Sequence, residues 1–128
     1  MELAGQHSFP KEEKICGKRD IATLMAEGRW GGSACLRFCC LMPNGLEHSR
    51  ILVSVPKKHF KRAVKRNLLK RRIREAYRLQ KGLLAEAGTP LGADILFVYN
   101  SAQIVSFAEI LEAVAAILSD IRRQGTGS

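Results

Sequence analysis

The sequence contains no apolar run approaching the ~20 residues that a helix needs to cross a bilayer, which argues against a transmembrane protein. Its first residues, Met-Glu-Leu-Ala-Gly-Gln-His, lack a charged start followed by an apolar block, so we expect no secretory signal. Both absences favour a cytoplasmic protein without a membrane partner.

Motifs for metal binding or protein-based catalysis are absent as well. The four Cys residues include no C-x-x-C pair, and the three His residues have no H-x3-H partner, so no zinc site is predicted. Cys35 and Cys39 fall on one face of a predicted strand and Cys40 on the other, which is typical of buried thiols in a reduced cytosol. Because paired carboxylates and an activated nucleophile are also lacking, we predict no catalytic residue and no metal ligand in the protein.

The 128 residues, of which 46% are hydrophobic, suffice for one domain with a packed core. No repeat or change of composition marks a second domain, so we predict a single domain over residues 1–128. The polar residues 1–14 and the Gly-rich residues 124–128 are expected to be flexible.

Acidic residues are nearly absent from one stretch of the chain. Twelve of the 21 Lys and Arg residues lie between Lys57 and Lys81, where Glu75 is the only acid. This stretch therefore carries +11 and the remainder −2 of the net charge of +9. Concentrated like charge costs folding free energy through self-repulsion, and a solvated surface usually intersperses acids. The pattern therefore favours a polyanionic partner.

Hydrophobic periodicity predicts an α+β fold, a two-layer sandwich with a small central sheet. A helix is expected over 19–27, with Ile21, Leu24 and Met25 on one face and Gly28 as its end. A Gly-rich turn at 30–32 and strands over 34–42 and 50–55 follow, and the Pro-Asn-Gly at 43–45 favours an antiparallel hairpin between these strands. Beyond a loop at 88–92, a strand over 94–99 precedes a helix that Ser106 caps, with Glu109 reaching back.

The basic stretch itself is predicted to be a helix over 62–84 that joins two strands of the same sheet. Its apolar side carries Leu68, Leu69, Ile73, Ala76, Leu79 and Leu83. Its polar side carries Arg66, Asn67, Lys70, Arg71, Arg74 and Arg78. Arg66, Lys70 and Arg74 form one i, i+4 row whose like charges repel by roughly a few tenths of a kcal/mol per pair. A bound phosphate backbone would reverse that sign.

Three polyanions could meet this helix. A membrane-surface helix needs an exposed apolar face, which here is required for the core. A DNA-binding helix-turn-helix needs a short companion helix, but a strand and Pro56 precede this one. A folded RNA fits best, because Arg makes two-point contacts with phosphate and Asn suits exposed base edges.

Ten residues of this helix carry a family resemblance. The segment Arg66-Asn67-Leu68-Leu69-Lys70-Arg71-Arg72-Ile73-Arg74-Glu75 closely resembles the R-N-x-x-K-R-x-x-R-E signature of the bacterial ribonuclease P protein component. The preceding Ser54-Val55-Pro56-Lys57-Lys58 and Ala63-Val64-Lys65 are similar to the family's strand end and helix entry. The similarity extends over about residues 9–121.

The resemblance implies an accessory subunit of an endoribonuclease, ribonuclease P. Such a protein pairs with a catalytic RNA that holds most of the Mg²⁺, and together they remove the 5′ leader from precursor tRNA. RNA-subunit contacts are implied for Arg66, Asn67, Lys70, Arg71, Arg74 and Arg78. Lys57, Lys58, Arg62 and Lys65 would extend that surface. A left-handed strand-helix-strand crossover is also implied, against the usual right-handed rule.

The family's leader-binding cleft lies between sheet and helices, and here the sequence departs from the family. Many relatives carry aromatic residues on the first helix where Ile21 and Met25 stand, so we expect leader contacts from these two residues together with Phe38 and Tyr99. A second hypothesis is a non-catalytic RNA-binding protein, such as a ribosomal component. Leader removal with a ribonuclease P RNA separates the two hypotheses.

Overall fold

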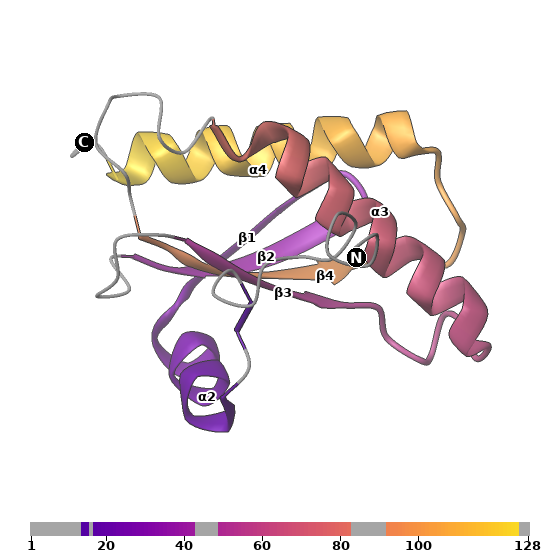
Figure 1. Ribbon diagram of the computed structural model, residues 1–128, viewed down its shortest axis with the longest axis horizontal. Coiled ribbons are helices and arrows are strands. Elements are labelled where there is room, and N and C mark those ends of the chain that lie inside the picture. Colours follow the sequence, from indigo (N-terminus) through magenta and orange to yellow (C-terminus); the bar gives the residue numbers. More distant parts are fainter. Residues whose placement is uncertain (1–13, 16, 43–48, 83–91, 126–128) are drawn as a thin grey trace, which may run out of the picture.

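The structure is a computed structural model that describes residues 14–15, 17–42, 49–82 and 92–125 (Figure 1). The chain order is α2 (Lys18–Glu27), β1 (Arg29–Ser33), β2 (Leu36–Leu41), β3 (Arg50–Ser54), α3 (Ala63–Gln80), β4 (Asp94–Tyr99) and α4 (Phe107–Gly125). Figure 1 shows α3 and α4 on one side of the sheet and α2 on the other. The predicted α+β class with one small sheet is confirmed. The turn predicted at 43–45 and most of the two flexible ends lie outside the described residues.

The sheet has the order β1-β2-β4-β3, with antiparallel pairs β1–β2 and β2–β4 and a parallel pair β3–β4. The predicted hairpin between residues 34–42 and 50–55 is therefore wrong, because β4 lies between these two strands. β4 is buried along nearly its whole length, on both faces, and such a strand is stable only in the middle of a sheet. The prediction that the long helix joins two strands of one sheet is confirmed by α3, which connects β3 to β4. The hand of this crossover stays a prediction.

Residues 30–32, predicted as a turn, belong to strand β1. Gly31 lies opposite Phe38, and a Cβ at Gly31 would come within 2.8 Å of the Phe38 ring. Glycine is needed at position 31 because the Phe38 ring occupies the space of a side chain, and not because the chain turns there. The turn comes later, at Ala34, whose φ of 52° lies in the left-handed region.

The two faces of the sheet are packed differently. Alternate residues of the strands face α3 and α4 and form the larger core, which includes Phe38, Phe97 and Tyr99. The other face has a small cluster in which Leu24 of α2 packs against Cys39 and Leu96. The predicted arrangement of the thiols is partly wrong, because Cys35 joins Cys40 in the larger core. Cys35 precedes the first residue of β2, so the alternation of the strand does not extend to it. Burial raises the pKa of the Cys40 thiol to about 12.

Helix α2 ends where it does because of Gly28. The Gly28 N–H donates to the Leu24 carbonyl at 2.8 Å, and a Cβ at Gly28 would lie 2.5 Å from Cys39 Sγ. This confirms Gly28 as the predicted end of the helix. Leu24 is fully buried and Ile21 half-buried, whereas Met25 is 50% exposed, so the predicted apolar face is only partly covered.

Helix α3 buries a slightly different stripe from the predicted one. Leu69, Ile73 and Ala76 are buried as expected, but Tyr77 joins them and Leu79 is 54% exposed. Tyr77 follows Ile73 by four residues and so stays on the same face, whereas Leu79 follows it by six and turns away. In α4, the Ser106 cap is confirmed by the Glu109 N–H, which donates to Ser106 Oγ at 3.2 Å.

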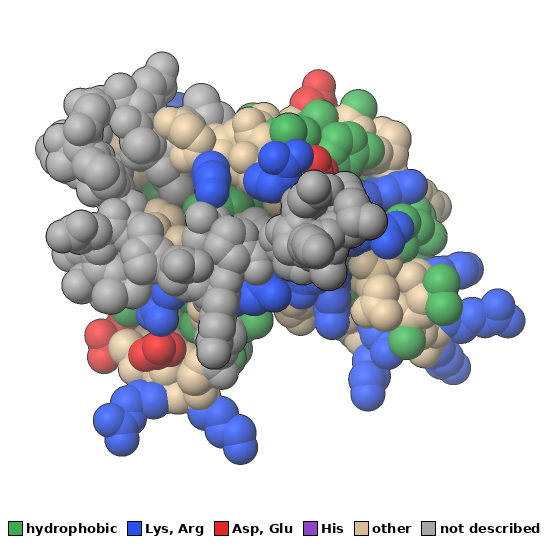
Figure 2. Space-filling view, viewed as in Figure 1, with side chains coloured by type: hydrophobic (Ala, Val, Ile, Leu, Met, Phe, Trp, Pro, Cys, Tyr) green, Lys and Arg blue, Asp and Glu red, His purple; other side chains and the backbone are tan. Residues whose placement is uncertain are grey.

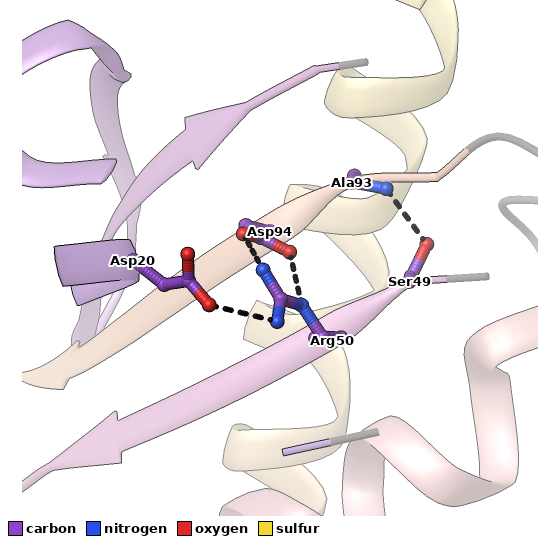
Figure 3. A network of polar contacts seen from close by, with 5 residues as sticks. All are labelled: Asp20, Ser49, Arg50, Ala93 and Asp94. Atoms are coloured by element: carbon purple, nitrogen blue, oxygen red, sulfur yellow. Dashed lines mark hydrogen bonds and ion pairs between the residues drawn. The ribbon is translucent and has the colours of Figure 1, made fainter. Parts of the chain in front are cut away.

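A polar network joins α2 to the sheet (Figure 3). The Arg50 guanidinium donates to both carboxylate oxygens of Asp94, at 2.9 and 2.6 Å, and to Asp20 of α2 at 3.1 Å. Asp94 is only 3% exposed. One residue before Arg50 and Asp94 in each strand, the Ala93 N–H donates to Ser49 Oγ at 3.2 Å. The beginning of β3, the beginning of β4 and helix α2 are thus held at one point.

The outer edge of β3 contacts the N-terminal part of the chain. Lys14 forms an isolated parallel bridge with Ile51, and the Ile15 N–H donates to the Ile51 carbonyl at 3.1 Å. Ile15 is 3% exposed and packs in the small cluster beside Leu24.

Removing the Asp94 charge is expected to destabilise the protein strongly. Asp94→Asn leaves the Arg50 guanidinium without its buried counterion, which costs about 3–5 kcal/mol of unfolding free energy. Asp20→Asn is the matched control. It removes a contact of the same guanidinium from a carboxylate that is 48% exposed, and is expected to cost no more than about 1 kcal/mol. Urea unfolding followed by circular dichroism measures both, and equal losses would contradict this ranking.

Candidate nucleic-acid interface

The cations of α3 and of the segment before it lie on the surface. Lys57, Lys58, Arg62, Lys65, Asn67, Arg71, Arg74 and Arg78 are exposed, and Arg66 and Lys70 are half-buried. Figure 2 shows Lys and Arg side chains gathered at the end of the molecule where α3 begins. We call the ten named residues the basic surface. Its side chains point away from the core side of the helix, as the periodicity predicts, and their contact with RNA stays a prediction.

Carboxylates are nearly absent from this surface. Within the described ranges, no carboxylate pairs with Lys70, Arg71 or Arg74. Arg78 differs, because its guanidinium donates to Glu75 at 2.5 and 3.1 Å. Both partners of this pair are about half exposed, and water screens such surface pairs. Arg78 is therefore partly neutralised by the one acid of the stretch, and the remaining cations keep their positive potential.

Arg66 has a structural role that the sequence analysis missed. Its guanidinium donates to the backbone carbonyls of Phe60 and Lys61, at 2.7 and 2.9 Å. The helix has no side-chain cap at Arg62 and no acid in its first turn, so Arg66 fixes the chain at the entry to α3. Phe60, 7% exposed, anchors the same segment in the core with its ring 5.9 Å from that of Tyr99.

Arg72, which lies near the apolar side of α3, points to the neighbouring helix. Its guanidinium donates to the Val105 carbonyl at 3.3 Å, just before α4 begins. Arg71, Arg72, Glu75 and Phe107 together line a surface pocket between the two helices. The long stem of Arg72 thus runs to the edge of the core, while Arg71 beside it remains on the basic surface.

The four residues expected at the leader do not come together. Ile21 and Met25 lie on α2, but Phe38 and Tyr99 are 1% and 0% exposed in the core on the opposite face of the sheet. The Tyr99 hydroxyl donates to the Gln103 carbonyl and accepts from the Val105 N–H. The prediction that these two rings meet a ligand is therefore wrong, because both are consumed by core packing.

On the α2 face the exposed aromatic residue is Trp30 of β1. Its ring is 41% exposed, and the Arg37 guanidinium carbon lies 5.3 Å from the ring centroid. The turn predicted at 30–32 hides Trp30, whereas Arg37 lies within the strand predicted over 34–42 and is not among the predicted site residues. Alternation through a strand over residues 29–33 would have placed Trp30 on a sheet face.

No group of three or more His, Cys, Asp or Glu in the described part of the chain could hold a metal ion. Among the described helices, none is both long and apolar enough to span a membrane.

The fold and the motif define a small α+β protein with a cationic helix on one side of a four-stranded sheet. A family model described as Ribonuclease P matches residues 9–122. The chain belongs to the ribonuclease P protein component family.

Individual relatives agree with this assignment. The ribonuclease P protein component of Porphyromonas gingivalis is 38% identical over 110 residues, which cover 81% of this chain and 79% of the relative. That of Dictyoglomus thermophilum is 45% identical over 82 residues, 64% of this chain and 67% of the relative. The solved RNase P protein of Thermotoga maritima is 26% identical with a TM-score of 0.71, covering 84% of this chain and 96% of that one. The Staphylococcus aureus protein, 22% identical with a TM-score of 0.72, shares the fold, over 86% of this chain and 95% of that one.

The backbone contacts of Arg66 predict that its replacement affects folding, unlike that of Arg74, which lies about two turns further along the exposed side of α3. Arg66→Ala loses two hydrogen bonds to backbone carbonyls and is expected to lower the unfolding free energy by about 1–2 kcal/mol. Arg74→Ala is the control and should stay within about 0.5 kcal/mol of the wild type. Thermal and urea unfolding measure the difference. Equal stability of the two variants would show that the Arg66 contacts contribute nothing to the fold.

Proposed function

We propose that this protein is the protein subunit of ribonuclease P, which binds the catalytic RNA through the basic surface and assists removal of the 5′ leader from precursor tRNA. The observation that carries the proposal is the unneutralised group Lys70, Arg71 and Arg74 inside the family's signature motif. Membership of the family supports it, as do the names of the relatives.

The basic surface acts by neutralising phosphates. Lys70 and Arg74 stand one helical turn apart, so the cations repel one another in the free protein. An RNA backbone placed along the helix turns that repulsion into attraction and releases condensed counterions. Arg74 and Arg71 can each hold a phosphate through two parallel N–H donors, which fixes the orientation of the RNA as well as its affinity.

The catalytic groups and the Mg²⁺ are proposed to belong to the RNA subunit. The described part of the protein has no cluster of three potential metal ligands, and Glu75, the acid within the basic surface, is already paired with Arg78. Mg²⁺ is commonly held by phosphate oxygens, waters and few carboxylates, which suits an RNA site. The protein then contributes positive charge that reduces the Mg²⁺ concentration needed for folding the RNA and binding its substrate.

Replacing the three unpaired cations is expected to weaken RNA binding without affecting the fold. Lys70→Ala/Arg71→Ala/Arg74→Ala should reduce the slope of log affinity against log salt by about 3, one for each lost phosphate contact. Its melting temperature should match the wild type, since these side chains make no described contact with the core. The control, Lys18→Ala/Arg19→Ala, removes exposed charge from α2 on the other side of the sheet and should keep most of the affinity for the RNA subunit. Equal losses in both variants would mean that only overall charge matters.

Reconstitution tests the activity directly. The protein is expected to stimulate leader removal from precursor tRNA by a bacterial ribonuclease P RNA at low Mg²⁺, where the RNA alone is poorly active. The product is scored as the released 5′ leader on a gel. Tight RNA binding without stimulation would favour a non-catalytic RNA-binding role instead. Leader removal by the protein without any RNA would overturn the assignment of catalysis to the RNA.

A further inference from the structure

A surface pocket opens between α3 and α4 at the border of the basic surface. Its volume is about 350 Å³, and two guanidiniums, one carboxylate and one aromatic ring line it, from Arg71, Arg72, Glu75 and Phe107. This volume lies at the lower end of the roughly 300–1,000 Å³ that is typical of small-ligand sites. The pocket therefore suits one small group and not an extended chain.

Hydrogen bonds between the two helices fix the walls of this pocket. The Arg72 guanidinium donates to the Val105 carbonyl at 3.3 Å, at the entry to α4. Further along the same pair of helices, Gln80 Nε2 donates to the Leu111 carbonyl at 3.1 Å. The helices thus hold their spacing before a ligand binds, so less conformational entropy is lost on binding.

The pocket is positively charged although a carboxylate lines it. The Arg78 guanidinium donates to both oxygens of Glu75, at 3.1 and 2.5 Å, and so offsets the charge of that carboxylate. Within the described ranges, neither Arg71 nor Arg72 forms an ion pair with a carboxylate. The two guanidiniums therefore attract an anion, and a guanidinium can hold a phosphate through two parallel N–H donors.

Phe107 adds an aromatic surface to this positive charge. The side chain is half-buried, because it packs against the larger core and also lines the pocket. Among the described Phe, Tyr and Trp residues, only Phe107 and Trp30 are not buried, and Trp30 lies on the opposite side of the sheet. Phe107 is therefore the described ring that a ligand of the basic surface can reach.

We propose that this pocket binds one nucleoside phosphate, an unpaired nucleotide of the RNA subunit, with its base on the Phe107 ring and its phosphate on Arg71. This inference deepens the proposed function and depends on it. A nucleotide combines a flat π surface with an anionic group, as the lining requires, and every base can stack on an aromatic side chain. Arg71 belongs both to the pocket and to the basic surface, so an RNA backbone that follows α3 passes the pocket. A base within a duplex has its faces covered by its neighbours, so the pocket selects a nucleotide that is unstacked.

Photo-cross-linking in the complex with the RNA subunit locates the nucleotide. A photoreactive p-benzoylphenylalanine replaces Phe107 and, in a matched control, Ala116, which is exposed further along α4. We expect position 107 to cross-link to one unpaired nucleotide of the RNA subunit and position 116 to give no such product. No cross-link at position 107, or equal cross-links at both positions, would overturn the RNA subunit as the source of the nucleotide.

The affinity of variants for the RNA subunit provides the second test. Phe107→Leu keeps an apolar side chain for the core but removes the ring, and should weaken binding by about 5-fold or more, the loss expected for one stacked base. Phe107→Tyr keeps the ring and should bind as the wild type. Trp30→Leu removes an exposed ring from the other side of the sheet, and as the control it should also leave this affinity unchanged. Wild-type affinity of Phe107→Leu would contradict stacking on the ring.

A double-mutant cycle distinguishes a shared nucleotide from a loss of packing. If Arg71 and Phe107 hold the same nucleotide, Arg71→Ala/Phe107→Leu should lose less affinity than the product of the two single fold-losses, because either change already releases the nucleotide. Lys65→Ala removes a cation of the basic surface that does not line the pocket, and its fold-loss should multiply with that of Phe107→Leu. Multiplication in both pairs would show that Phe107 acts only through the fold.

Free AMP distinguishes the two sources of the same chemistry. It is titrated into the protein alone, and binding is followed by the NMR shifts of the protein. If AMP binds the wild type but not Arg71→Ala, while position 107 gives no cross-link to RNA, the pocket takes a free nucleotide and the RNA subunit is excluded as the source. If neither AMP nor the RNA subunit reaches the pocket, the proposal is wrong.

The outcomes also separate the pocket from the proposed function. If the wild-type protein stimulates leader removal but Phe107→Leu keeps full affinity for the RNA subunit, only the pocket is wrong. If the wild type does not stimulate removal, the proposed function fails, and the AMP titration still tests the pocket.

Discussion

The arrangement of the molecule depends on the burial of β4 on both of its faces. Phe97 and Tyr99 point to α3 and α4, while Leu96 points to the cluster under α2. A strand with apolar side chains in both directions has to lie inside the sheet, so β2 and β3 take positions on either side of it. This order leaves α3 as the connection between two parallel neighbours and places its outer face in solvent. The position of the basic surface thus depends on the burial of the apolar side chains of β4, a strand that contributes no residue to that surface.

The basic surface and the exposed Trp30 on the opposite side of the sheet both lie next to segments that polar contacts hold in place. On the α3 side, the Arg66 guanidinium and the buried Phe60 ring fix the segment that presents the preceding cations. On the other side, Arg50 joins Asp94 of β4 to Asp20 of α2, and so sets the position of the helix that borders Trp30 (Figure 3). Groups that meet a ligand act best when their own positions are fixed before binding, because less conformational entropy is then lost. Both sets of contacts involve β4, through Tyr99 against Phe60 and through Asp94 against Arg50.

The sequence predicted those features that local periodicity and local motifs determine. The basic helix, its exposed side, the strand over 94–99 and the caps at Gly28 and Ser106 follow from spacing alone, and the signature around Asn67 indicated the family. Strand pairing was predicted wrongly, because the position of β4 between β2 and β3 depends on burial that is long-range in the chain. β1 was taken for a turn, since glycine's preference for turns outweighed the need of the Phe38 ring for space. The same error hid Trp30. The burial of Phe38 and Tyr99 could not be predicted without knowing which face of each strand packs against α3 and α4.

The bridge between Lys14 and Ile51 protects the outer edge of β3 from pairing with a strand of another molecule. An outermost strand exposes unsatisfied N–H and C=O groups, and these can recruit a strand from another molecule into a continuous sheet. Here the Ile15 N–H already occupies the Ile51 carbonyl, and the Ile15 side chain is sealed into the small cluster. A strand from another molecule could pair with β3 only after residues 14 and 15 had been displaced, which would expose Leu24 and Cys39 to solvent. Residues 14 and 15 thus block intermolecular sheet formation at the edge strand β3, which pairs in parallel with β4.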